Sequence, residues 1–417
     1  MTQRWWLIVA LIGLVSMGSV LGQGLPTTRP EAAGLSEERL DRLTQVVQTE
    51  VDKREIPGVV ALIARHGKVA YFRSFGMADR EAGRAMSKDS LFRIASMSKP
   101  VTSVAVMILY EEGRLLLTDP VEQFIPEFKD PKVLVRSDAG EATLVPAKRP
   151  ITIRNLLNHT SGITYGDGPH APYYQEAGMT VGLSPTEGTI GEMVKKLAAL
   201  PLICQPGDEM HYGMSTDVLG YLVEVVSGMP FDEFCRKRIF EPLGMKDTCF
   251  VLPSQKLNRL ARTYRFDPDG RMAPMDEDLS YLVRQTYFSG GAGLVSSASD
   301  YVRFAQTILN KGQLEGTRIL SPQTVELMTS NSIGDLYIPF RIIGDKFGYG
   351  FGIRTERGQY DELEPLGIFG WDGAFYTRFW IDPRNDLIAV FMSQVDNHWA
   401  DRFAATFRVM VYQAVVE

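Results

Sequence analysis

Residues that favour β-strands gather near both ends of this chain, and the long segment between them is mostly helical in pattern. The runs 59–65 and 69–74 are rich in branched and aromatic side chains and flank His66-Gly67, a pair typical of a tight hairpin turn. Similar runs recur much later, at 349–354, 375–381 and 387–392. We therefore expect an α/β domain whose sheet comes from both ends of the chain and is interrupted by a helical insertion.

Amphipathic patterns predict helices beside the sheet and within the insertion. Ser36 is a candidate N-cap before Glu37 and Glu38, and apolar residues then recur on one helical face. A second amphipathic pattern covers 403–414. Further helices are predicted at 101–113, 191–200, 217–228 and 299–309. These patterns assign the α/β part to about 30–95 and 290–417, and the helical insertion to about 100–289.

Charge and composition exclude several classes of protein. The 417 residues include 44 basic and 50 acidic side chains, for a net charge of −6, without the basic run that a nucleic-acid surface requires. None of the five histidines has the spacing of a metal motif, and the three cysteines are too far apart for CxxC. We expect a globular protein with buried thiols, no nucleic-acid partner, no metal and no organic cofactor.

Residues 1–22 have the pattern of a secretory signal peptide. Arg4 supplies an early positive charge, an apolar run covers 5–21, and Gly22 lies near the expected cleavage point. The alternative is a retained membrane anchor, but glycines and serines interrupt the run, and a span needs about 20 apolar residues. We expect a mature chain of 23–417 in the periplasm or outside the cell, with no stable membrane insertion after cleavage.

Ser96 and Lys99 form the pattern Ser-x-x-Lys at the start of an apolar helix. This spacing places both side chains on one helical face, and Pro100 is best tolerated in a first helical turn. A serine hydroxyl becomes nucleophilic when a neighbour takes its proton, and a desolvated lysine can assist that transfer. The pattern also arises by chance in long chains, so alone it carries little weight.

Two later segments contain groups that such a serine needs. Tyr212 precedes a predicted helix, and a phenol can act as a general base when nearby cations favour its charged form. The alternative is a half-buried aromatic residue. Trp371-Asp372-Gly373-Ala374 leads into a predicted strand, where Gly373 allows close backbone approach and an adjacent amide can bind an oxyanion. The alternative there is a simple turn before the strand.

Taken in this order, Ser96-x-x-Lys99, Tyr212 and Trp371-x-Gly373 resemble the serine β-lactamase and penicillin-binding superfamily. The likeness is greatest to class C β-lactamase-like esterases, the family VIII carboxylesterases. It covers roughly 30–415 and includes the segments 156–162, 239–245 and 290–296. The resemblance implies a β-lactamase/transpeptidase-like fold of the α/β (α+β) class, with an antiparallel sheet flanked by helices and a helical subdomain.

The same resemblance implies roles for individual residues. Ser96 is the acylated nucleophile, Lys99 its partner in the proton network, and Tyr212 the base that later acts as an acid. The amides of Ser96 and Ala374 form the oxyanion hole, because Ala374 follows the Trp371-x-Gly373 triplet as the oxyanion residue follows the Lys-Thr-Gly triplet of relatives. Removal of one such donor typically costs about 3 kcal/mol of transition-state stabilisation.

Two positions depart from the superfamily pattern. Trp371 stands where β-lactamases and penicillin-binding proteins usually carry a lysine that holds the substrate carboxylate, and Met214 stands where the Tyr-x-Asn motif has its asparagine. The loss of a cation and an amide disfavours anionic β-lactam or D-Ala-D-Ala ends and favours neutral esters. We therefore expect an esterase acting on a small-molecule ester. The alternatives are an acyltransferase, a β-lactam or D-Ala peptide hydrolase, and a non-catalytic envelope binding protein.

Other polar residues near these motifs are interpreted structurally. His159 is expected to bond the backbone of its loop, and Asp217 to be an acidic residue of an early helical turn. The polar stretches 162–187 and 267–293 are predicted to be long surface loops that border the site. Tyr165 is one of several aromatic residues in these loops and is assigned no role.

Overall fold

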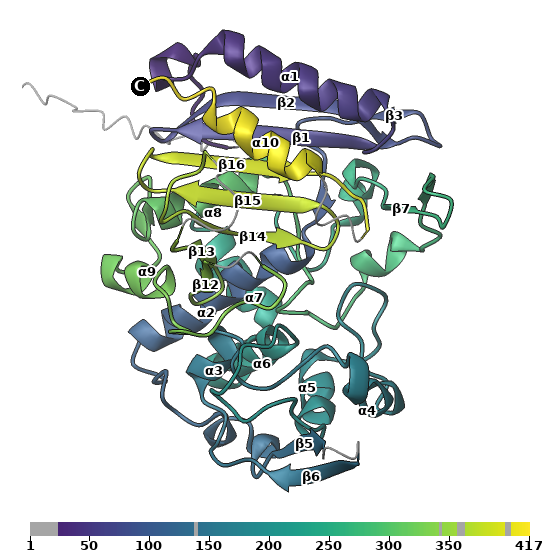
Figure 1. Ribbon diagram of the computed structural model, residues 1–417, viewed down its shortest axis with the longest axis vertical. Helices are drawn as coiled ribbons and strands as arrows, with labels where there is room; N and C mark the ends of the chain where they lie inside the picture. The colour runs from purple at the N-terminus through teal and green to yellow at the C-terminus, as the bar shows by residue number, and fades with distance from the viewer. Residues whose placement is uncertain (1–23, 137–140, 342–343, 357–362, 397–401) are drawn as a thin grey trace, which may run out of the picture.

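The computed structural model describes residues 24–136, 141–341, 344–356, 363–396 and 402–417 (Figure 1). The predicted signal peptide at 1–22 lies outside these ranges. Among the helices of the described ranges, none has the length and apolar character needed to cross a bilayer.

An eight-stranded antiparallel sheet is assembled from both ends of the chain, as the sequence predicts (Figure 1). The N-terminal part supplies β1 (Gly58–Arg65), β2 (Lys68–Asp79) and β3 (Arg84–Ala85). The C-terminal part supplies β12 (Asp345–Phe347), β13 (Gly352–Arg354), β14 (Phe369–Gly373), β15 (Thr377–Asp382) and β16 (Leu387–Met392). The two parts join where β1 pairs with β16, in the strand order β12-β13-β14-β15-β16-β1-β2-β3.

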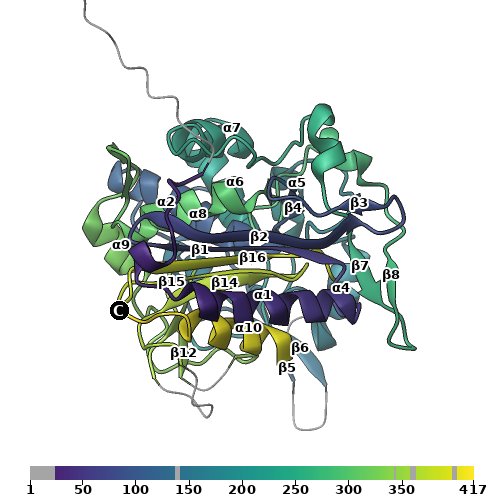
Figure 2. The same ribbon diagram turned by 90° about the horizontal axis from the view of Figure 1, so that it is seen from above.

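Both faces of this sheet are covered, which explains why β1 is buried along its whole length. Successive side chains of a strand point to opposite faces. Val60 and Leu62 accordingly belong to the large core toward the helical region, whereas Ala61 and Ile63 belong to a second core. The helices α1 (Glu37–Asp52) and α10 (Arg402–Tyr412) cover the second face (Figure 2).

Local signals set the ends of several of these elements. The Ser36 hydroxyl accepts a hydrogen bond from the Arg39 amide at 3.3 Å, which makes Ser36 the N-cap of α1. At the β1–β2 turn His66 and Gly67 have φ values of 53° and 70°. Such a left-handed pair matches the twist of a two-residue hairpin.

The region between the two parts of the sheet is mainly helical but also contains short hairpins. Its helices are α2 (Ser98–Glu111), α3 (Ile153–Leu157), α4 (Ala171–Glu176), α5 (Ile190–Ala198), α6 (Ser215–Ser227) and α7 (Phe231–Cys235). The hairpins pair β5 (Lys132–Arg136) with β6 (Ala142–Pro146) and β7 (Tyr264–Phe266) with β8 (Met272–Pro274). The last part of this region, before β12, contains α8 (Ala298–Leu309), the hairpin of β10 (Gln313–Leu314) and β11 (Thr317–Arg318), and α9 (Pro322–Met328).

Three segments differ from their sequence predictions. The stretch 162–187 includes α4, and the stretch 267–293 includes β8 and a 3₁₀ helix, Leu279–Val283, so neither is wholly loop. These elements are too short for their periodicity to stand out. The run 349–354 is a strand only at Gly352–Arg354, because the chain turns at Gly350, where φ is 88°.

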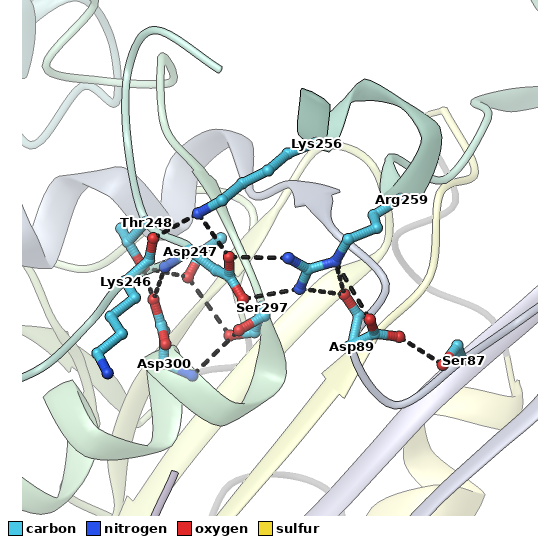
Figure 3. Close-up of polar contacts among 10 residues, drawn as sticks. Ser87, Asp89, Lys246, Asp247, Thr248, Lys256, Arg259, Ser297 and Asp300 are labelled. Atoms are coloured by element: carbon cyan, nitrogen blue, oxygen red, sulfur yellow. Dashed lines mark hydrogen bonds and ion pairs between the residues drawn. The ribbon is translucent and has the colours of Figure 1, made fainter. Parts of the chain in front are cut away.

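A buried cluster of polar residues connects the start of α8 to the loop that follows Lys246 through hydrogen bonds (Figure 3). One oxygen of Asp300 accepts hydrogen bonds from the Asp247 amide at 2.6 Å and the Thr248 hydroxyl at 3.0 Å. Asp247 itself pairs with Lys256 and Arg259 at 2.8 and 2.7 Å. Burial raises the pKa of Asp300 to about 6, even though these hydrogen bonds oppose the shift.

Candidate active site

Ser96 lies in a tight connection between a short strand and the long buried helix α2. The strand is β4 (Phe92–Arg93), and a single 3₁₀ turn, Ala95–Met97, leads into α2, which begins at Ser98. The helix predicted at 101–113 therefore begins three residues earlier than expected, at Ser98, and Ser96 itself lies in the 3₁₀ turn before it. Ala95 is buried with φ of 44°, a left-handed conformation that costs roughly 1–2 kcal/mol for a residue with a Cβ atom. Ser96 therefore lies near the positive end of α2, in a turn whose backbone is strained at Ala95.

Lys99 is fully buried, and each hydrogen of its ammonium group has an acceptor. Its Nζ atom donates to the Ser96 hydroxyl at 3.0 Å, the Tyr165 hydroxyl at 3.0 Å and the Gly291 carbonyl at 2.9 Å. Burial lowers the pKa of Lys99, but the oxygens of Tyr165 and Tyr212 outweigh it and the net pKa is raised. In this arrangement the Lys99 ammonium is in hydrogen-bond contact with the Ser96 hydroxyl.

Tyr212 lies in the loop before α6, beside both Lys99 and the strand that carries Trp371. The Lys99 ammonium is 4.6 Å from the centroid of the Tyr212 ring. The Trp371 indole donates a hydrogen bond of 2.8 Å to the Tyr212 oxygen. Tyr212 thus has a cation over its ring and an N–H donor at its oxygen, and it lies next to the cluster that contains Ser96.

Tyr165 is a second phenol at the same lysine, and sequence reasoning assigned it no role. Its hydroxyl is one of the three acceptors of Lys99, and its ring meets that of Tyr212 edge to face at 5.7 Å. Burial raises the pKa of Tyr165 against the opposing effect of Lys99, so its phenol is neutral. The available signal was its position three residues after Gly162, at the end of a segment on which the family resemblance rests.

Gly373 brings the end of β14 against the turn that carries Ser96. A Cβ atom at Gly373 would lie only 2.3 Å from the Ile94 carbonyl oxygen, so only glycine allows this approach. Ala374 and Phe375 pack with Ala95, and the cluster places Ala374 beside the residue that precedes Ser96. The close approach that the sequence suggested at Gly373 is thus made to the protein's own backbone.

Trp371 is buried against aromatic neighbours. Its ring meets that of Phe347 edge to face at 5.0 Å, and the guanidinium group of Arg341 lies 4.8 Å from its centroid. Its single N–H donates a hydrogen bond to the Tyr212 oxygen. Trp371 therefore shapes the surroundings of Tyr212 directly.

Asp217 holds the loop that presents a carbonyl to Lys99. It is buried in the first turn of α6 and accepts hydrogen bonds from Ser289 at 2.6 Å and Tyr287 at 3.1 Å. Burial raises the pKa of Asp217, against the effect of these hydrogen bonds and of Lys99. The expected early position in a helix is confirmed, whereas its contacts with the loop before Gly291 were not foreseen.

His159 is buried, and its ring is hydrogen-bonded to the backbone of the loop before α6. Its Nδ1 atom accepts a hydrogen bond of 3.4 Å from the Gly213 amide, as the structural interpretation expects. Burial, with a smaller effect from Lys99, holds the pKa of His159 well below its usual value, so the ring is neutral. Within the described ranges, no group of three or more histidine, cysteine or acidic side chains is placed to hold a metal ion.

Comparisons with known proteins identify the family of this chain. The family model described as Beta-lactamase matches residues 43–413. Protein Rv1367c of Mycobacterium tuberculosis is 35% identical over 369 residues, covering 85% of this chain and 90% of its own. Esterase EstB of Burkholderia gladioli is 32% identical over 362 residues, covering 82% and 86%.

A solved structure has the same architecture. It is EstCE1, described as a hydrolase with promiscuous acyltransferase activity, with a TM-score of 0.78 and 28% identity over 90% of this chain and 99% of its own. The predicted fold class is therefore confirmed. The chain belongs to the Beta-lactamase family, within the serine β-lactamase and penicillin-binding superfamily that also includes family VIII esterases.

Proposed function

We propose that this protein is a serine hydrolase that cleaves carboxylic esters through an acyl-enzyme on Ser96. The observation that carries the proposal is the hydrogen-bonded cluster of Ser96, Lys99 and Tyr165, with Tyr212 against the same ammonium group. These groups come from three separate segments of the chain and meet at one buried point. The esterase among the relatives supports this choice of reaction within the family.

The chemistry divides into acylation and deacylation. In the reactive form the Tyr212 phenolate receives the Ser96 proton within the hydrogen-bond network of Lys99, and the Ser96 oxygen attacks the ester carbonyl. The amides of Ser96 and Ala374 hold the resulting oxyanion. The carbon–oxygen bond to the alcohol then breaks, and Tyr212 returns its proton to the departing alkoxide. Water attacks the acyl-enzyme by the same route, releasing the acid and restoring Ser96.

The residues around the cluster favour a neutral ester as substrate. Trp371 and Met214 are both buried where relatives that bind anionic substrates use a lysine and an asparagine. The nearby cation Arg341 is already paired with Asp372 at 2.7 Å. We propose a small-molecule ester as the partner and, from the pattern of residues 1–22, a location in the periplasm or outside the cell.

Acyl transfer is the second candidate, because the solved structure EstCE1 is a hydrolase with promiscuous acyltransferase activity. The same acyl-enzyme would pass its acyl group to an alcohol in place of water. Product analysis with an added alcohol separates the two reactions. A dominant ester product would favour the transferase, and a dominant free acid would favour the hydrolase.

The test of the proposed function is labelling and turnover at Ser96. A fluorophosphonate probe should label the wild-type protein at Ser96, and mass spectrometry of the peptide should locate the adduct. Ser96→Ala should lose both labelling and p-nitrophenyl ester turnover while the protein still folds, as a cooperative thermal unfolding transition would show. Retained turnover in Ser96→Ala would rule out this nucleophile. Absence of both labelling and turnover in the wild type would favour the non-catalytic binding protein.

A further inference from the structure

Phe340 is an aromatic residue beside the catalytic cluster that the proposed reaction does not use. It lies between α9 and β12, and the residue is 56% exposed. Its ring nevertheless meets that of Tyr212 at 5.4 Å and that of Trp371 at 6.3 Å, both close to edge to face. One side of the ring therefore packs on the site, and the remainder is open to an incoming molecule.

Residues before and after Phe340 in the chain hold its segment in place. Arg341 pairs with Asp372 at 2.7 Å, and its guanidinium group lies against the Trp371 ring. Burial alone would raise the pKa of Asp372, but Arg341, with Arg378 and Arg408, lowers it, so the carboxylate is charged. The buried side chain of Ile338 anchors the preceding turn. Phe340 is thus held in place before a ligand arrives, which reduces the entropy cost of binding.

The position of Phe340 indicates which end of an ester it meets. The carbonyl oxygen would face the amides of Ser96 and Ala374, on the side where Ala95 and Ala374 pack together. The departing alcohol must instead face Tyr212, because it receives its proton there. A ring in contact with Tyr212 therefore lies on the alcohol side of the ester bond.

We propose that the exposed face of Phe340, together with the edge of Tyr212, forms a subsite for an apolar, aromatic alcohol group of the ester. This inference rests on the proposed function, because the direction of the substrate follows from Tyr212 acting as the acid. Aromatic rings gain from edge-to-face and offset contacts in addition to the burial of apolar area. The subsite therefore selects esters of arylalkyl alcohols over those of short aliphatic alcohols.

The test uses two pairs of esters whose alcohols have similar intrinsic reactivity. Ethyl acetate and 2-phenylethyl acetate differ only in the alcohol, whereas ethyl acetate and ethyl 3-phenylpropionate differ only in the acyl group. Phe340→Ala should lower kcat/KM for 2-phenylethyl acetate relative to ethyl acetate by about ten-fold or more. The ratio of kcat/KM for ethyl 3-phenylpropionate to that for ethyl acetate should differ from the wild-type ratio by less than about two-fold. Tyr337→Ala is the matched control, since Tyr337 lies in the same segment and is 68% exposed; it should leave both ratios unchanged.

A binding measurement keeps the inference separate from turnover. Saturation-transfer difference NMR should show contact between the wild-type protein and the ring protons of 2-phenylethanol, and Phe340→Ala should lose it. An unchanged alcohol ratio, or a change confined to the acyl pair, would overturn the proposal. If the wild type leaves all the esters intact and Ser96 takes no probe, the proposed function itself is wrong and the subsite assignment falls with it.

Discussion

The indole N–H of Trp371 donates a hydrogen bond of 2.8 Å to the phenol oxygen of Tyr212, across 159 positions of sequence. At the place where superfamily relatives usually carry a lysine, this chain has a neutral donor aimed at the proposed base. The indole donates to the phenol oxygen without adding a cation that would attract a carboxylate. The presence of tryptophan in place of lysine at position 371 therefore affects both the proposed base, Tyr212, and the choice of substrate.

Trp371→Phe should lower kcat for a small ester by about ten-fold or more, because a hydrogen bond to a charged oxygen is worth about 1.5–3 kcal/mol. KM should change little, since the Phe347 contact is kept. Trp371→Lys is the matched variant, because it restores an N–H donor and should recover part of the loss. Equal kcat values for the two variants would show that the donor is not responsible.

Tyr165→Phe and Tyr212→Phe should separate the two phenols at Lys99. Removal of the Tyr212 hydroxyl should lower kcat by about 10²–10⁴-fold, the range for loss of a general acid–base group. Removal of the Tyr165 hydroxyl leaves the buried ammonium with one acceptor fewer and should cost about 1–3 kcal/mol in the free energy of unfolding. Urea unfolding and ester turnover of both variants provide the comparison. If Tyr165→Phe were the less active variant, Tyr165 would be the proton carrier.

Gly373→Ala should impair activity through the backbone. The new Cβ atom would lie 2.3 Å from the Ile94 oxygen, so the end of β14 must move away from the Ser96 turn. Overpacking of this kind typically costs about 1–3 kcal/mol of stability, and a displaced oxyanion donor costs about 10²–10³-fold in kcat. Turnover and urea unfolding should be measured on the same preparation. Full activity would mean that the amide of Ala374 takes no part in oxyanion binding.

Asp300→Asn should remove a pH-dependent loss of stability. The pKa of Asp300 is 3.8 in its reference state and about 6 in the folded protein. A raised folded-state pKa means that the stabilising contribution is complete below the lower value and is lost as pH rises through about 6. From a pH of about 4.5 to about 7.5 this group should cost the wild type roughly 2 kcal/mol.

Urea unfolding at those two pH values tests the Asp300 prediction. Asparagine can still accept the Asp247 amide but cannot ionise, so the variant should lose less stability over this range. An identical pH dependence in wild type and variant would mean that Asp300 does not titrate there.

Local sequence patterns were sufficient for most of the sheet and for the pair that begins the site. The runs 387–392 and 59–65 match β16 and β1 closely, because buried strands leave uninterrupted apolar segments that periodicity detects. Ser96 and Lys99 could likewise be paired from their spacing, since three positions in a helical turn bring two side chains together. Short elements such as α4 were missed because a helix of only six residues is too short to show a clear hydrophobic periodicity.

The amino-acid order alone determined which groups are present: a hydroxyl and an amine one turn apart, a phenol before a helix, and a tryptophan in place of a lysine. Only the folded chain decided that Tyr165 joins Lys99, that Gly291 supplies its third acceptor, and that the Trp371 N–H meets Tyr212. These contacts join residues 66, 192 and 159 positions apart. No local propensity encodes such distances, because packing of the sheet against the helical region sets them.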